Sequence, residues 1–254
     1  MKARRGVAST TEGQLRKAIS ATGNFVSGLG LFVIGGILIA AVSIWLFSEV
    51  AEVVMRGSTQ AFDESVLRWL GVHHTKLLDA AMIEITALGT GTVVMMIVAV
   101  AALFLFLTHH RYSGLLLLVA TAGGIALNLL LKLQFDRPRP HVFVWGTNTV
   151  SSSFPSGHAM SATIVYSTVA YLAIRLYKRT WPRVVTAIIA AFVIVAISAS
   201  RLYLGVHYPS DVLAGAIIGL AWAAFCMATL EAVQKFTRKE RPDLYVEEDE
   251  PVDL

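Results

Sequence analysis

Cysteine and charge are both scarce in this chain of 254 residues. Cys226 is the only cysteine, which excludes an internal disulfide. Charged residues make up only 15% of the chain and hydrophobic residues 56%, and the mean hydropathy is +0.65. A soluble domain of this length needs more charge to cover its surface. The shortage of charge therefore excludes an ordinary soluble domain and indicates an integral membrane protein.

The apolar residues fall into six runs, most of them near the ~20 residues that cross a bilayer as a helix. We place these runs at 27–48, 87–108, 113–133, 157–176, 182–201 and 210–232. Because no repeat or low-complexity linker divides them, we predict an all-α, polytopic membrane protein with one domain over 1–254 and a six-transmembrane-helix bundle. In this scheme 27–232 is the six-span core, 1–26 a cytoplasmic N-terminal segment and 233–254 a cytoplasmic C-terminal tail. The first run exceeds the ~7–15 apolar residues of a signal peptide, so we expect an uncleaved span.

The long connection at 49–86 has a pattern of its own. Its apolar positions Phe62, Val66, Trp69 and Leu70 share one face of a helix. We therefore predict an interfacial amphipathic helix between spans one and two. Part of 77–86 is a candidate extension of the second span, because Asp79 and Glu84 stand in an otherwise helical pattern.

The basic residues are distributed unevenly between the two sides of the predicted bundle. Of the 21 Lys and Arg residues, two thirds flank the spans on one side, which by the positive-inside rule is the cytoplasmic side. Both termini are then cytoplasmic. Because the net charge of +4 comes largely from these flanks, a lipid bilayer and not nucleic acid is the expected partner.

Three short strings place charged and titratable residues at the outward ends of the spans. They are Lys132-x6-Arg139-Pro140, Pro155-Ser156-Gly157-His158 and Ser200-Arg201-x5-His207-x3-Asp211. Charges kept beside the hydrocarbon layer of a membrane are normally functional. Since all three strings fall on the side away from the cytoplasm, we expect them to converge on one site.

The residue types in these strings are suited to binding and transferring a phosphate. Lys132, Arg139 and Arg201 supply positive charge, and an arginine guanidinium can form bidentate hydrogen bonds with a phosphate. Ser156 and Gly157 stand where span four begins, and the free N–H groups of a helix N-terminus bind anions. Phosphoryl transfer needs such positioned positive charge more than any other aid.

The two histidines are predicted to have different tasks. His207 precedes Asp211 by four residues, and Pro209 between them favours the first turn of a helix. A carboxylate in that turn would orient the imidazole and raise its nucleophilicity, which makes His207 the candidate nucleophile. His158 lies on another span and would protonate the leaving group and then activate water.

The three strings together resemble the type 2 phosphatidic acid phosphatase superfamily of membrane lipid phosphatases, whose pattern is K-x6-RP, PSGH and SR-x5-H-x3-D. All eleven specified positions are filled in order. The resemblance implies a six-helix membrane fold and metal-independent dephosphorylation through a phosphohistidine. By position it implies His207 as nucleophile, His158 as acid/base and Asp211 as the partner of His207. The implied phosphate ligands are Lys132, Arg139, Ser156, Gly157 and Arg201.

Several polar residues outside the strings receive other interpretations. Arg137 either assists the phosphate or solvates its loop, and we favour the loop. Asp79 and Glu84 are interpreted as caps or solvated interface residues, and Asn128 as an interhelical hydrogen-bond donor. The outward carboxylates are too few and scattered to suggest zinc or calcium, so no metal and no cofactor is predicted.

The expected function is that of a lipid phosphate phosphatase at the outer surface of a bacterial inner (cytoplasmic) membrane. Undecaprenyl diphosphate, phosphatidylglycerol phosphate and phosphatidic acid are all suitable substrates, with the choice between them expected to lie in 49–86 and 141–154. The same residues would also serve a lipid phosphotransferase. A protein that binds or translocates an anionic lipid without chemistry would need the cations but not the histidines. The oligomeric state has no signature in the sequence.

Overall fold

The structure, a computed structural model, describes residues 4–141 and 151–240, with side chains described for 30–141 and 151–237. This part of the chain forms eight α-helices and no strand. The helices are α1 (Arg4–Met55), α2 (Gln60–Gly71), α3 (Lys76–Ala87), α4 (Gly91–Leu107), α5 (Arg111–Gln134), α6 (Gly157–Leu176), α7 (Thr180–Tyr203) and α8 (Pro209–Glu240).

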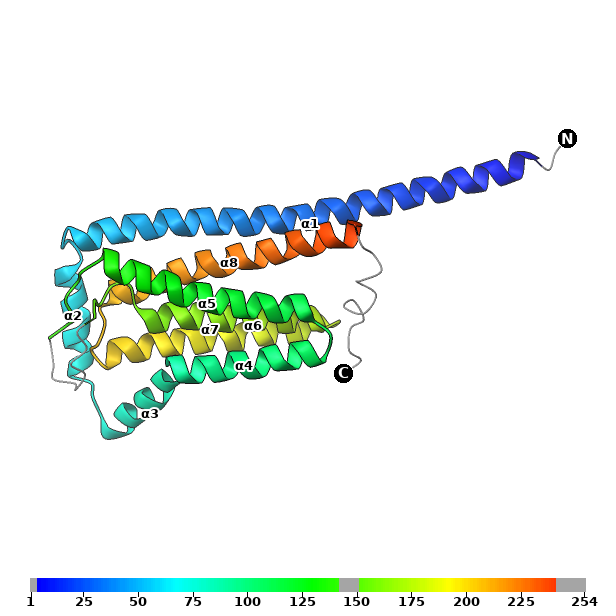
Figure 1. Cartoon of the computed structure of the whole chain (residues 1–254). Coiled ribbons are helices and arrows are strands. Elements are labelled where there is room, and N and C mark those ends of the chain that lie inside the picture. The colour runs from blue at the N-terminus through cyan, green and yellow to red at the C-terminus, as the bar shows by residue number, and fades with distance from the viewer. Residues whose placement is uncertain (1–3, 142–150, 241–254) are drawn as a thin grey trace.

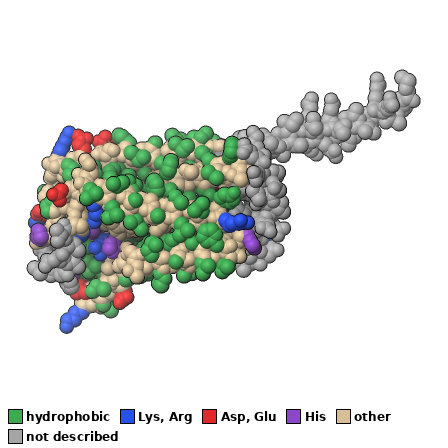
Figure 2. Space-filling model, viewed as in Figure 1, with side chains coloured by type: hydrophobic (Ala, Val, Ile, Leu, Met, Phe, Trp, Pro, Cys, Tyr) green, Lys and Arg blue, Asp and Glu red, His purple; other side chains and the backbone are tan. Residues whose placement is uncertain are grey.

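The long helices lie side by side in one bundle, and α2 crosses its end (Figure 1). α1 packs along α8, and α6 lies between α7 and α8. Large apolar side chains cover the outside as well as the core: Leu133 is 85% exposed and Phe192 71% exposed. Figure 2 shows hydrophobic side chains over the middle of the bundle and charged ones gathered at its ends. Such an apolar girdle is stable only against lipid, which confirms the all-α membrane fold.

Most of the predicted spans match the structure. Five helices of the described part are long and apolar enough to cross a membrane: Gly30–Met55 of α1, then α5, α6, α7 and Pro209–Thr237 of α8. The second predicted span, 87–108, is extended toward the N-terminus, as the helical pattern of 77–86 suggested, but it is not one continuous helix. Residues 88–90 form a break between α3 and α4, which are bent by 49° and together pass as one span. Because the 17 residues of α4 fall short of a bilayer's thickness, α3 has to supply the rest.

The end of α1 explains how the chain reaches α2. α1 continues to Met55, beyond the predicted limit of 48. Gly57 then has a φ of +73°, in the left-handed region that glycine adopts without cost. The N–H groups of Gly57 and Ser58 donate to the carbonyls of Val54 and Val53, as in a Schellman motif. This turn redirects the chain across the end of the bundle.

The segments that carry the three strings lie at one end of the bundle, beside α2. The chain passes this end after α5, before α6 and between α7 and α8, while the start of α1 and the end of α8 lie at the other end (Figure 1). Convergence of the strings, predicted from the distribution of basic residues, is thus confirmed for the described residues. The side of the membrane that each end faces stays a prediction.

Candidate phosphoryl-transfer site

His207 and Asp211 form the deepest part of the site. His207 lies in the connection between α7 and α8, and Pro209 begins α8 as its position predicted. His207 Nδ1 lies 3.6 Å from Asp211 Oδ2, and the two side chains are only 2% and 0% exposed. The backbone N–H of Tyr208 donates to the same Oδ2 at 2.9 Å. The carboxylate therefore faces the imidazole from a fixed position, as an orienting group must.

Burial dominates the acid–base behaviour of His207. Loss of solvent, together with the positive charges of Arg201 and Arg139, lowers the pKa of His207 to about 4, although Asp211 acts in the opposite direction. A lowered pKa means that the ring gives up its proton at a lower pH than a free imidazole does. The ring is consequently neutral, and able to act as a nucleophile, at any pH above about 4.

We expect His207 to remain neutral in mildly acidic solution. At about pH 5.5, where an unperturbed imidazole is largely protonated, ¹⁵N NMR of histidine-labelled protein should show a neutral ring for His207. The signal is assigned by its loss in the His207→Asn variant. A protonated His207 at that pH would contradict the burial described here.

The Pro155–His158 segment is docked directly onto the start of α8. The N–H of Ser156 donates to the Asp211 carbonyl at 3.0 Å, and Ser156 is the residue before the first turn of α6. Gly215 allows this approach, because a Cβ at that position would lie 2.5 Å from the Ser156 carbonyl oxygen. The N-terminus of α6, a natural anion site, is thereby held next to the His207–Asp211 pair.

Substitution of Gly215 by alanine should disturb the site through backbone contact alone. The added methyl has to displace Ser156, and such overpacking costs roughly 1–3 kcal/mol. We expect a lower melting temperature in detergent and, because small misplacements slow positioned reactions, roughly tenfold slower turnover. Gly35→Ala is the matched control, since a Cβ there meets no atom within 4 Å. Equal behaviour of the two variants would contradict the close packing.

His158 lies in the first turn of α6 and is held from the side by the α3–α4 break. A Cβ on Gly89 would lie 3.0 Å from His158 Cδ2 and 2.7 Å from Ile197 Cγ2. Gly89 therefore packs closely against α6 and α7, with His158 as one of its contacts. The break in the second span thus helps to place the predicted acid/base.

The three predicted phosphate cations are anchored at the same end. Lys132 Nζ donates to the carbonyl of Ser152 at 3.2 Å. Arg139 donates from Nε to the carbonyl of Ser151 at 3.1 Å and from Nη1 to that of Val206 at 3.0 Å. Arg139 therefore ties the segment before α6 to the connection that carries His207.

Several polar groups of the site point inward without a protein partner. Arg201 Nη1 donates to Thr86 Oγ1 at 2.9 Å, but its Nε is buried with no hydrogen bond to protein. Ser156 Oγ is buried and without a hydrogen-bond partner in the same way. His158 is within electrostatic range of Arg201, His207, Lys132 and Arg139. Buried polar groups are normally paired, so these groups are arranged for something other than internal stability.

Arg137 differs most from its sequence interpretation. It was expected to solvate its loop, yet its side chain is only 7% exposed. Its guanidinium contacts both Asp63 on α2 and Asp211 on α8, and it lies 4.2 Å from the centre of the Tyr208 ring. Asp63 was missed as well, because only the outward apolar stripe of its helix was considered. The available signal was an acidic residue directly beside that apolar stripe.

Other polar residues outside the strings have structural contacts. Asp79 is neither a cap nor freely solvated: Tyr203 donates its hydroxyl to Asp79 Oδ1 at 2.6 Å, and His74 Nδ1 lies 3.0 Å from the same oxygen. This pairing joins α3 to α7. Asn128 makes the predicted interhelical hydrogen bond, to the sulfur of Met160 on α6.

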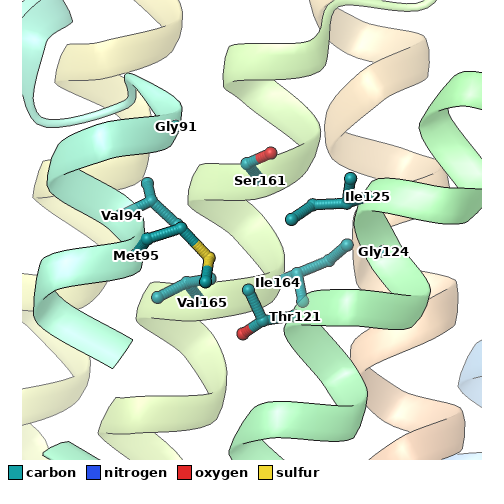
Figure 3. A pocket seen from close by; sticks show the side chains of 9 residues that line it. All are labelled: Gly91, Val94, Met95, Thr121, Gly124, Ile125, Ser161, Ile164 and Val165. Carbon is teal, nitrogen blue, oxygen red and sulfur yellow. The ribbon is translucent and has the colours of Figure 1, made fainter. Parts of the chain in front are cut away.

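A small cavity lies between α4, α5 and α6. Figure 3 shows that mostly apolar or small side chains line it, with Ser161 on α6 the residue nearest in sequence to His158. Its volume of about 30 Å³ holds about one water molecule and no lipid chain. Among the residues whose side chains are described, no group of three or more His, Cys, Asp or Glu could hold a metal ion. Metal independence itself stays a prediction.

Comparison with known proteins gives a consistent result. Residues 113–238 match the family model of the PAP2 superfamily. Phosphatidylglycerophosphatase B of Bacillus subtilis (strain 168) is 30% identical over 200 residues, which are 78% of this chain and 98% of that protein. Undecaprenyl-diphosphatase BcrC of the same organism is 30% identical over 156 residues, covering 58% of this chain and 72% of the relative.

The fold has a solved counterpart. The crystal structure of a transmembrane PAP2-type phosphatidylglycerolphosphate phosphatase from Bacillus subtilis matches with a TM-score of 0.73 and 29% identity, over 78% of this chain and 98% of the other. The chain belongs to the PAP2 superfamily.

Proposed function

We propose that the site at the α2 end of the bundle removes phosphate from a membrane lipid through a covalent phosphohistidine on His207. The enzyme class rests on the family and on relatives that are phosphatases: the chain is a membrane hydrolase of lipid phosphate esters. One observation carries the mechanism. A buried imidazole backed by Asp211 shares one site with three cations and with unpaired groups of Ser156 and Arg201.

The first half of the reaction forms the phosphoenzyme. The phosphate oxygens contact Lys132, Arg139 and Arg201 and the first N–H groups of α6, which together offset the charge that develops on the equatorial oxygens. The neutral nitrogen of His207 that faces the phosphate attacks phosphorus, and the bond from phosphorus to the lipid oxygen breaks. His158 protonates the departing oxygen, and Asp211 stabilises the charge on the His207 ring.

The second half returns the enzyme to its initial state. His158, now neutral, takes a proton from a water molecule, whose oxygen attacks phosphorus. The bond between phosphorus and His207 breaks, and inorganic phosphate leaves. His207 is again neutral and His158 is again protonated, so each turnover consumes one lipid phosphate and one water.

We place the site on the extracytoplasmic face of a bacterial inner membrane. Two observations support this orientation. Lys and Arg are in excess near the two ends of the chain, and the start of α1 and the end of α8 lie at the end of the bundle away from the site. The lipid tail would remain in the bilayer while its head group enters the cation cluster. Phosphatidylglycerol phosphate and undecaprenyl diphosphate are the favoured substrates, because relatives are named for acting on these two lipids.

The test is phosphate release from a panel of lipid phosphates by the purified protein in detergent. We expect release from at least one of phosphatidylglycerol phosphate, undecaprenyl diphosphate and phosphatidic acid, inhibition by orthovanadate and no inhibition by a chelator. Absence of release from the whole panel would contradict the function. Transfer to an added lipid acceptor in place of water would identify a phosphotransferase, and strong inhibition by the chelator would overturn metal independence.

A further inference from the structure

Arg137 lies between two buried carboxylates that come from different helices. Its Nη2 donates to Asp63 Oδ2 at 2.8 Å, and its Nη1 donates to Asp211 Oδ1 at 2.6 Å. Both aspartates are fully buried. Although 74 residues separate Arg137 from each aspartate, one planar guanidinium joins them, as its forked geometry allows.

Asp63 also holds the first turn of α8. Its Oδ1 accepts the backbone N–H of Ser210 at 3.1 Å, and its Oδ2 accepts the Ser210 hydroxyl at 2.5 Å. The N–H groups of a first turn have no partner within their own helix, so a carboxylate from α2 satisfies one of them. Ser210 directly precedes Asp211, and the contact therefore fixes the turn from which the Asp211 side chain points to His207.

We propose that Asp63 and Arg137 are positioning residues for the Asp211–His207 pair, an inference that rests on the proposed function. Arg137 holds Oδ1 of Asp211, which leaves Oδ2 to the Tyr208 N–H and the His207 ring. Asp63 shares the positive charge of Arg137. Without Asp63, that charge would act on Asp211 alone and weaken its support for a positively charged, phosphorylated His207.

The surface of α2 supports a role beyond packing. Its outward side chains Phe62 and Trp69 are 64% and 61% exposed, whereas the inward Asp63 is 0% exposed. An apolar residue at an inward position usually stabilises a fold as well as or better than a buried ion pair does. The helix thus presents Phe62 and Trp69 outward and, beside the buried Leu67, a carboxylate inward. That carboxylate contacts Arg137 and Ser210, next to the candidate nucleophile's partner Asp211.

The test is a double-mutant cycle on phosphoenzyme formation. Asp63→Asn, Asp211→Asn and the combined variant are compared with the wild-type protein on the best lipid phosphate of the panel, in steady-state assays that give kcat and KM and in single-turnover assays that give the rate of phosphoenzyme formation. We expect Asp63→Asn to lower kcat by roughly 10–100-fold with KM unchanged, because an interaction made in the transition state is weakened. In the Asp211→Asn background the same change should have less than a twofold effect, roughly the scatter of independent measurements.

Glu64→Gln is the matched control, since it removes the same charge from the neighbouring position of α2. Glu64 accepts hydrogen bonds from Gln60 and Arg68 and does not itself contact Arg137; its indirect link is Gln60, which accepts a long hydrogen bond from Arg137 at 3.3 Å. The activity of Glu64→Gln should therefore stay within about twofold of that of the wild type. If Asp63→Asn does not fold, Arg137→Lys replaces it in the cycle. Lysine keeps the positive charge but lacks the planar guanidinium that contacts both aspartates at once.

Two results would overturn the inference: Asp63→Asn with the activity of Glu64→Gln, or a loss that is fully additive with Asp211→Asn. Additivity would show that Asp63 only stabilises the fold. Either result in an active enzyme leaves the proposed function intact. A wild-type protein that releases no phosphate from any lipid contradicts the function instead.

Discussion

Replacement of His207 by alanine is expected to reduce phosphate release to the background rate. Without the imidazole no covalent intermediate forms, and the cations can only bind the phosphate. Removal of a nucleophile that acts together with its partners costs about 10⁴-fold or more in kcat. The measurement is inorganic phosphate released from the best lipid substrate by purified protein in detergent.

The His207→Ala result needs two controls. His73→Ala removes an exposed imidazole near the same end of the bundle, and it should retain wild-type activity. Vanadate binding and the melting temperature should show that the His207→Ala protein is folded and still binds an anion. A folded variant that retains more than about one hundredth of the wild-type rate would show that His207 is not the nucleophile, since such losses are far larger for essential groups.

Asp211→Asn should produce the second largest loss. Asparagine removes the negative charge that Arg137, the Tyr208 N–H and the His207 ring share. The imidazole then loses its preferred tautomer and the support for its positive charge, which in a comparable triad costs about 10⁴-fold in kcat. We expect a fall of about 10³–10⁴-fold in kcat with little change in KM, measured as initial rates over a range of lipid concentrations.

The exposed carboxylate of Asp136 provides a control for the Asp211 experiment. Asp136→Asn removes one negative charge, as Asp211→Asn does, from the connection next to Arg137. It should leave kcat and KM unchanged. An Asp211→Asn variant that turns over at the rate of Asp136→Asn would remove Asp211 from the mechanism.

The sequence revealed the spans and the convergence of the strings because charges are rare in this chain. In an apolar helix of about 20 residues, a lysine or histidine is easily recognised as unusual. Its position at one end of a span then predicts its depth in the membrane. The spacing of His207, Pro209 and Asp211 also sufficed to predict the local turn. These features depend on residues close in sequence.

The missed features depend on contacts between distant residues. The break at 88–90 brings Gly89 against His158 and Ile197, and no local pattern reveals these contacts. The bridge from Asp63 through Arg137 to Asp211 joins three segments, and in the sequence Asp63 and Arg137 each resemble an ordinary surface or loop charge. Part of the predicted specificity segment 141–154, residues 142–150, lies outside the described residues, so its role stays a prediction.

The most direct test of the mechanism is detection of phosphate on His207 itself. Protein mixed with ³²P-labelled lipid phosphate and quenched in alkali, where phosphohistidine survives, should carry label during turnover, and mass spectrometry should place it on the peptide containing His207. The label should be absent from His207→Ala. Turnover without any labelled histidine, or label on His158 in its place, would contradict the account.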